Sequence, residues 1–280
     1  MAKIAVVTDS TADLTSNQLQ EYDITRVPLQ VMIADQEYQD WVEINPDQFL
    51  KKLEVSDHLP TTSQPPVGRF VKVYEELAKE YDHIISLHVS TQLSGTIKAA
   101  QLAADMVEEV EIKVIDSETV SISLGIMAIE VAKKVKEGTK LGKIIKFIDR
   151  IKEQVGIYFT VDDLDYLEQG GRIGKAAAFL GNLFKVRPLM TVEDGEVAPY
   201  KKVRGEKRLY RVFKEVIDGK LDNKKGQKLV ILYSKYQDKA KQLEEILTNE
   251  FAWREVEVRK LGPVIGSHVG PTAFGAAIYK

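Results

Sequence analysis

The chain has 280 residues, 44% of them hydrophobic and 29% charged, which is enough to bury a core in two domains of ordinary size. Its net charge is −3 and its basic residues are scattered, which argues against nucleic acid as the main partner. The lack of cysteine excludes disulfides, thiolate catalysis and thiolate metal sites. The charge-free stretch of the most apolar predicted helix, residues 119–129, is too short to span a bilayer, and no signal segment precedes the first strand. We therefore expect a cytoplasmic protein without an integral membrane span.

The first half of the sequence alternates predicted strands and helices. Apolar runs predict strands at residues 3–8, 84–89 and 111–115, and a further half-buried strand carries Val27, Leu29, Val31 and Ile33. Helical spacing gives two apolar stripes, at Phe70, Val73, Tyr74, Leu77 and Tyr81, and at Ala99, Leu102, Ala103, Met106 and Val110. Three further helices are expected: one that begins near residue 46, one that ends near residue 137, and one at residues 141–151. This alternation predicts an α/β domain over residues 1–155, with a mostly parallel sheet and helices on both faces.

The second half predicts a different arrangement. A strand at 155–161 precedes a short helix that Gly170-Gly171 ends, then a helix at 176–184 and a hairpin at 190–202 around Asp194-Gly195. Helices at 206–217 and 238–250 alternate with strands at 229–233 and 256–260. We expect a smaller α+β domain over residues 156–280, whose loop at 262–272 faces the cleft between the domains.

Two hydroxyl-rich segments are candidates for anion binding. Residues 60–66 read as a loop held at both ends by proline, and Ser94, Gly95 and Thr96 lie where a helix begins. Free N–H groups and the positive end of the helix dipole at that point suit an anion, although an ordinary helix cap is the commoner role. Because no Lys or Arg lies between His88 and Ile97, an anion there would meet neutral donors.

A third candidate is His268, which glycines and prolines bracket between residues 262 and 271. A single histidine is more often structural than catalytic, but flanking glycines suit a close approach by a ligand or by backbone. The chain has no phosphate-binding glycine loop, dinucleotide fingerprint or nucleophile elbow, and its four histidines lack metal-ligand spacing. This inventory favours a binding protein over an enzyme.

Five segments spread over the whole chain, in order, resemble the DegV family of bacterial fatty-acid-binding proteins. They are residues 8–14 (TDSTADL), 61–65 (TTSQP), 93–96 (LSGT), 162–173 (DDLDYLEQGGRI) and 266–271 (GSHVGP). Each segment is weak evidence alone, and the five together are specific. The resemblance implies two domains that close on one long-chain fatty acid, of C14–C18 length, in an apolar tunnel.

The resemblance also implies roles for particular residues. Thr62, Ser94 and His268 would hold the carboxylate, within binding loops that include Ser63, Gly95, Thr96 and Ser267. Arg172 and Arg204 match family positions near the carboxyl end, as candidates for contacts with the head group or a partner, and surface salt bridges are the alternative for both. The bound acid would be presented to a separate fatty-acid kinase, which makes the acyl phosphate used in phospholipid synthesis. The chain is thus expected to be a carrier rather than an enzyme, and to need no cofactor or metal.

Two departures from the family pattern and one alternative function remain. Pro66 replaces a usual Ser, which is expected to alter the capping of the following helix, and Thr272 replaces a usual Gly, which is expected to redirect the chain after His268. The alternative is a hydrolase or acyltransferase that uses Ser94 or Ser267 with His268 as base, with Asp9 or Asp162 as the orienting carboxylate.

Overall fold

The computed structural model describes residues 2–180 and 186–280 and contains three sheets. A four-stranded sheet has the order β2-β1-β6-β7, and all its pairs are parallel. Its strands are β1 (Ile4–Asp9), β2 (Ile24–Val27), β6 (His83–His88) and β7 (Glu111–Asp116). The alternating β-α connections predicted this parallel sheet, and the structure confirms it.

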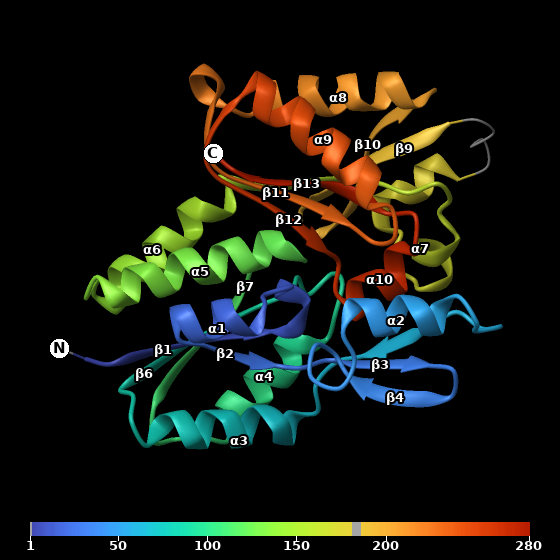
Figure 1. Cartoon of the computed structure of the whole chain (residues 1–280). Helices are drawn as coiled ribbons and strands as arrows, with labels where there is room; N and C mark the ends of the chain where they lie inside the picture. The colour runs from blue at the N-terminus through green and yellow to red at the C-terminus, as the bar shows by residue number, and fades with distance from the viewer. Residues whose placement is uncertain (1, 181–185) are drawn as a thin grey trace.

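Helices cover both faces of the parallel sheet, as Figure 1 shows. On one face lie α3 (Val67–Ala78) and α4 (Thr96–Ala104), and on the other lie α1 (Ser16–Tyr22), α5 (Ile122–Lys136) and α6 (Leu141–Lys152). The strands are therefore apolar on both sides: in β1, Ala5 and Val7 pack toward α3 and α4, whereas Ile4 and Val6 pack toward α5.

A six-stranded mixed sheet follows, with the order β10-β9-β8-β13-β11-β12. Only β11 and β12 pair in parallel; the other neighbours are antiparallel. Its strands are β8 (Val155–Thr160), β9 (Arg187–Glu193), β10 (Glu196–Val203), β11 (Lys225–Tyr233), β12 (Ala252–Lys260) and β13 (Phe274–Tyr279). Its outer face is covered by α8 (Glu206–Asp218) and α9 (Gln237–Glu250), so the second half is α+β as predicted.

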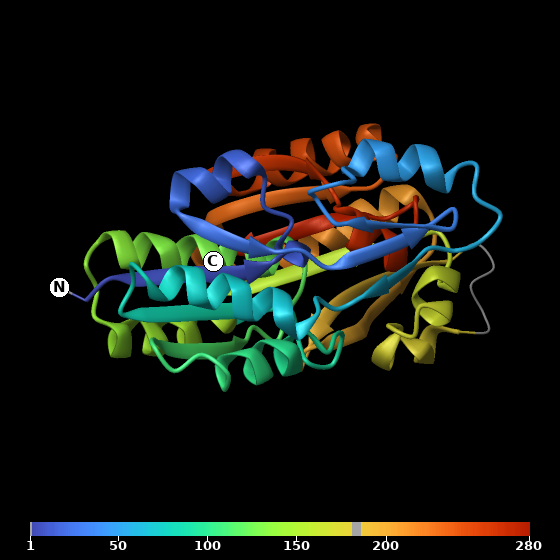
Figure 2. The ribbon, with the colours of Figure 1, turned by 90° about the horizontal axis from the view of Figure 1, so that it is seen from below.

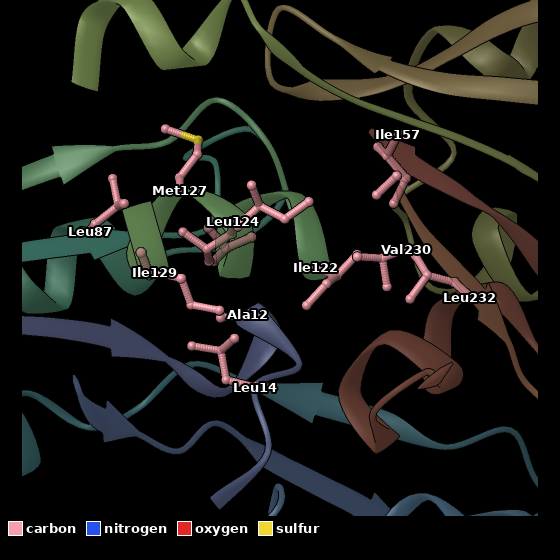
Figure 3. Packing of buried hydrophobic residues seen from close by; sticks show 14 of the residues in the cluster. Ala12, Leu14, Leu87, Ile122, Leu124, Met127, Ile129, Ile157, Val230 and Leu232 are labelled. Atoms are coloured by element: carbon pink, nitrogen blue, oxygen red, sulfur yellow. The ribbon is translucent and has the colours of Figure 1, made fainter. Parts of the chain in front are cut away.

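Helix α5 lies between the two large sheets and contacts both. Figure 3 shows its side chains Leu124, Met127 and Ile129 lying between Leu87 of the first sheet and Ile157 of the second. The first eight residues of α5, Ile122–Ile129, are all buried, and the helix forms the middle layer of the protein. Within the described residues, no helix is both long and apolar enough to cross a membrane.

A small antiparallel sheet, β4-β3-β5, lies to one side of these layers. It contains β3 (Gln30–Ile33), β4 (Gln36–Gln39) and β5 (Thr61–Ser63). Helix α2 (Pro46–Leu53) packs beside it, and so does α10 (Pro263–Val269) from the far end of the sequence (Figures 1 and 2). Short elements complete the fold: η1 (Ser10–Ala12), α7 (Asp165–Gln169), η2 (Gly174–Phe179) and η3 (Asp222–Lys224).

Several predicted elements were wrong in detail. The single strand predicted through Val27 and Ile33 is two strands, β2 and β3, in different sheets. The α4 stripe was wrong at Leu102 and Met106, which are 57% and 66% exposed. Leu102 lies opposite the buried alanines of the helix, and Met106 lies beyond its end at Ala104. The helix predicted at 176–184 is a 3-10 helix at Gly174–Phe179, and residues 181–184 lie outside the described part.

Two predicted loops contain regular structure. Residues 61–63 form β5, because Thr62 pairs with Val31 at the edge of the small sheet. The predicted loop at 262–272 contains α10, which begins with a proline at its first position, where the missing N–H costs nothing.

Candidate functional site

Thr62 and His268 meet directly although 206 positions separate them in sequence. The Oγ1 atom of Thr62 lies 2.8 Å from Nε2 of His268. Thr62 is the central residue of β5, whose pairing with β3 fixes the direction of its side chain. The tertiary fold therefore brings together two of the three residues predicted to hold a carboxylate.

His268 lies in the last turn of α10, and the backbone at Gly170 packs closely against its ring. A Cβ on Gly170 would lie 2.6 Å from Nδ1 of His268, so a side chain at position 170 would collide with the imidazole. Gly270 caps the helix at φ 75°, a left-handed conformation that favours glycine. At the glycines that bracket His268 in sequence, the neighbouring groups are side chains: Asp13 and Trp41 at Gly262, Phe49 at Gly266 and Tyr166 at Gly270.

The imidazole of His268 is neutral near pH 7. Burial, with a smaller effect of the Arg172 charge, lowers its pKa from 6.5 to about 4. Its Nδ1 atom has no hydrogen-bond partner in the described part of the chain. The ring therefore offers hydrogen bonds without a positive charge of its own.

The Ser94 loop forms the other side of the site. Gly95 is the N-cap of α4, Ser94 Oγ lies 2.9 Å from Thr96 Oγ1, and Ser94 Oγ accepts the Thr96 N–H at 3.3 Å. The capping alternative therefore describes part of what Ser94 does. Gln64 packs against Gly95, because a Cβ at that position would meet the Gln64 side chain.

Thr62, Ser94 and His268 line one cavity of about 870 Å³, a volume that includes its mouth. Its remaining wall is mostly aliphatic and comes from both large sheets and their connections. It includes Val89, Val120, Ile157, Val192, Leu232 and Val264. An apolar cavity with a few convergent polar groups is typical of small-molecule sites.

The other predicted residues fall into three groups. Ser63 and Arg172 also line the cavity, whereas Thr96 is fully buried below the loop. Arg172 Nε and Nη1 donate to the carbonyls of Leu93 and Gly170, at 3.0 and 2.7 Å, so two of its donors hold the loops together. Arg204 is exposed after β10 and is not part of the cavity wall.

Ser267 does not form a nucleophile pair with His268. Its Oγ donates to the Pro263 carbonyl, 2.8 Å away and one helical turn earlier. Asp162 instead forms an ion pair with Arg187, at 3.2 Å. Among the described residues no carboxylate makes a hydrogen bond to His268.

The Pro66 and Thr272 substitutions have local structural consequences. Pro66 is the N-cap of α3 and makes no side-chain capping bond, as expected when Ser is replaced. Thr272 does not adopt a positive φ, and its Oγ1 accepts the Asp162 N–H at 3.0 Å. Neither residue contacts Thr62, Ser94 or His268 through the hydrogen bonds of the described chain.

Sequence reasoning missed a buried polar chain beneath the cavity. Asp9 Oδ2 lies 3.0 Å from His88 Nδ1, His88 Nε2 lies 2.6 Å from Ser86 Oγ, and Ser86 Oγ lies 2.8 Å from Tyr74 OH. The side chains of Asp9 and His88 are fully buried. The strand-end segment 8–14 was the signal for such a group, because polar residues at the carboxyl end of a buried strand need partners.

Comparison with known proteins gives the family. A family model described as an uncharacterised protein of the DegV family matches residues 3–280. The chain belongs to the DegV family. Protein DegV of Bacillus subtilis is 34% identical over 273 residues, which are 97% of each chain. A DegV domain-containing protein of Halalkalibacterium halodurans is 37% identical over 280 residues, covering 100% of this chain and 99% of that protein.

Solved structures of DegV proteins have the same fold. A DegV family protein from Thermus thermophilus, described by its fatty acid binding, matches with a TM-score of 0.94 and 34% identity over 99% of both chains. The structure of DegV from Bacillus subtilis, described as a fatty acid binding protein, matches with a TM-score of 0.91 and 34% identity over 100% of both chains. The recognition of the family from five short segments is confirmed.

Proposed function

We propose that this chain binds one long-chain fatty acid in the cavity and presents its carboxylate to a separate kinase in the cytoplasm. The observation that carries the proposal is the joining of an aliphatic cavity to the Thr62–His268 pair and Ser94. The DegV relatives described as fatty acid binding proteins support the class of ligand.

The cavity wall favours an acyl chain because each methylene moved out of water contributes about 0.8 kcal/mol. Some fifteen methylenes contribute on the order of 10 kcal/mol before ordering costs are subtracted. The head group therefore need not supply the affinity. It must only avoid being buried without hydrogen bonds.

The polar end of the cavity can bind a carboxylate and still leave one of its oxygens accessible. Ser94 can donate one hydrogen bond to a carboxylate. While Thr62 and the neutral His268 stay bonded to each other, that pair has one donor left, either the Thr62 hydroxyl or His268 Nδ1–H, whereas a bidentate arginine clamp would occupy both oxygens. Thr62, Arg172 and His268 also line a second, partly polar hollow that Tyr166 and Gln169 border, so a second opening lies beside the carboxyl end. We place the kinase's approach there: a carboxylate oxygen would attack the terminal phosphorus of a nucleoside triphosphate, and the nucleoside diphosphate would leave.

Mass spectrometry of lipid extracted from the purified protein tests the binding directly. We expect a C14–C18 fatty acid at about one per chain, by analogy with the family. Val192→Trp, which fills the cavity, should lower palmitate affinity at least a hundredfold, whereas Val55→Trp on the 80% exposed Val55 should leave it unchanged. Normal binding by Val192→Trp would contradict the proposed cavity.

Presentation needs a separate test with a fatty-acid kinase. Replacing both Thr62 and Ser94 by Ala should reduce acyl-phosphate formation at saturating palmitate. If both fatty-acid binding and kinase turnover survive that double substitution, the roles of these hydroxyls are wrong. The hydrolase alternative predicts labelling of a serine by a fluorophosphonate, which we do not expect.

A further inference from the structure

Asp13, the second acid of segment 8–14, is a buried carboxyl that joins distant parts of the chain. It is 1% exposed. Its Oδ1 accepts the Gly262 N–H at 3.0 Å and the Trp41 Nε1–H at 3.3 Å, and its Oδ2 lies 2.6 Å from the Ser121 hydroxyl. One side chain thus ties the loop after β4 and the start of α5 to the residue that caps α10.

Asp40 is a second buried carboxyl at the same place. It is fully buried, and its Oδ1 accepts the Val264 N–H at 3.4 Å. Its Oδ2 has no hydrogen-bond partner within the described residues. Asp13 and Asp40, the carboxyl pair, therefore both receive amides from the first turn of α10, although they belong to the opposite half of the sequence.

The backbone around the carboxyl pair is strained. Asp13, Trp41 and Ser121 have φ values of 52°, 63° and 58°, in the left-handed region that side chains disfavour. Trp41 and Ser121 are the two residues whose side chains bond Asp13. Strain of this kind persists only where surrounding structure holds it, and it gathers at functional positions.

Helix α10 transmits the position of its first turn to His268. It is seven residues long, with Gly262 as its N-cap and His268 in its last turn. A Cβ on Gly262 would lie 2.3 Å from both Asp13 Oδ1 and Trp41 Nε1, so the start of the helix has no room to shift toward the carboxyl pair. Any displacement of the first turn therefore moves the imidazole relative to Thr62.

Two arginines lie near the buried carboxyl pair, and burial raises the pKa of both carboxyls. Arg259 Nη1 donates to the Asp13 carbonyl at 3.2 Å, and Arg26 donates to the carbonyls of Leu14 and Trp41, both at 3.2 Å. Burial raises the pKa of Asp13 to about 7, and burial also raises the pKa of Asp40 well above its usual range. When Asp13 is protonated, it donates to Ser121 and still accepts from Gly262.

We propose that Asp13 and Asp40 are positioning residues, which fix the start of α10 so that His268 reaches Thr62 at the carboxylate end of the cavity. This proposal rests on the proposed fatty-acid function. Segment 8–14 thereby contributes to the site indirectly, because Asp13 positions α10 but is not one of the residues proposed to bind the carboxylate.

The experiment compares Asp13→Ala with Asp13→Asn. The asparagine can accept from Gly262 and donate to Ser121, so it reproduces the bonds of the protonated carboxyl. We expect Asp13→Ala to weaken palmitate binding at least tenfold and Asp13→Asn to stay within threefold of the original chain. Leu247→Ala, in the core under α9, serves as a control that lowers stability without touching α10.

NMR of the histidine side chains in lipid-free protein separates this inference from the function itself. Released from its position, His268 should titrate closer to 6.5 in Asp13→Ala, but not in Asp13→Asn or Leu247→Ala. An unchanged His268 titration and an unchanged palmitate Kd in Asp13→Ala would overturn the proposal. If Asp13→Ala does not fold, Ser121→Ala removes the hydroxyl that holds the Asp13 carboxyl in place: a wild-type His268 titration in that variant overturns the proposal, and a shifted one supports it.

Discussion

Two histidines in this protein each meet a hydroxyl, and their surroundings give them opposite roles. His88 lies between Ser86 and Asp9, with a serine, a histidine and an aspartate in hydrogen-bonded sequence, but all three are fully buried. His268 meets Thr62 beside a cavity, with no carboxylate bonded to it in the described chain. The set of residues that resembles a catalytic triad has no access for a substrate, and the accessible histidine lacks an orienting acid.

The contrast shows that the role of a histidine depends on whether a ligand can reach it and on which group bonds its other ring nitrogen. A buried carboxylate must be paired, and the Asp9 side chain also accepts the N–H groups of Thr11 and Val89, at 3.0 and 2.9 Å. That requirement explains the His88 contact without any reaction. At His268 the ring lines a cavity, and its Nδ1, unpaired within the described residues, lies against Gly170.

The largest effect we expect is on stability, from His88→Ala. Removing this imidazole leaves the Asp9 carboxylate without one partner and empties a space in the core, at a cost of about 3–5 kcal/mol in the free energy of unfolding. Urea denaturation measures it. His268→Ala should cost about 1 kcal/mol or less, because His268 sits at a cavity wall that is already open. Equal losses of unfolding free energy in the two variants would contradict the different roles given to His88 and His268.

Ligand affinity should show the reverse order. His268→Ala and Thr62→Val should each weaken palmitate binding by about tenfold to a hundredfold, the range expected for a hydrogen bond to a charged group. Because the two side chains bond each other, their effects should not add in the double variant. Calorimetric titration measures both. His58→Ala, at an exposed histidine, is the matched control and should bind normally.

The dependence of stability on pH separates His268 from Asp13. The folded pKa of His268, about 4, is below the unfolded value of 6.5, so its contribution is present above pH 6.5 and is lost as the pH falls toward 4. The folded pKa of Asp13, about 7, is above 3.8, so its contribution is present below pH 3.8 and is lost as the pH rises through 7. Thermal melts between pH 4 and 8 measure both effects. His268→Gln should lose the rise of stability with pH, and Asp13→Asn should lose the fall of stability with pH.

The smallest effect is expected from Ser267→Ala. This serine bonds the Pro263 carbonyl within α10, so its loss should change the free energy of unfolding by about 1 kcal/mol or less and leave palmitate affinity unchanged. A large loss of binding would mean that Ser267 contacts the ligand, as the sequence resemblance suggested.

The sequence predicted best what depends on local pattern. The α3 stripe was correct at its buried Phe70 and Tyr74, since a three- and four-residue apolar spacing is the direct signature of a helix packed on one side. The same rule failed at Leu102, because Ala99, Ala100 and Ala103 form the buried face of α4, and at Met106, because a stripe does not show where a helix stops. Pro263 after Gly262 was a helix-start signal that the glycine and proline content of the segment concealed.

The site was predictable only through the family resemblance. Local pattern marked the hydroxyl-rich segment 60–66, Ser94 and His268 as candidates, but it did not show that Thr62 would meet His268. Such pairings depend on how three sheets assemble. The roles of Asp13 and Asp40 were missed for the same reason, because their partners Gly262 and Val264 lie more than 220 positions away.

The three residues at the polar end come from the edge of the small sheet, the exit of the parallel sheet and a helix between strands of the mixed sheet. Neither half of the chain, expressed alone, would contain all three residues. The proposed fatty-acid binding would therefore require the whole folded chain, and a bound fatty acid should slow proteolytic cleavage at all the connections between these layers.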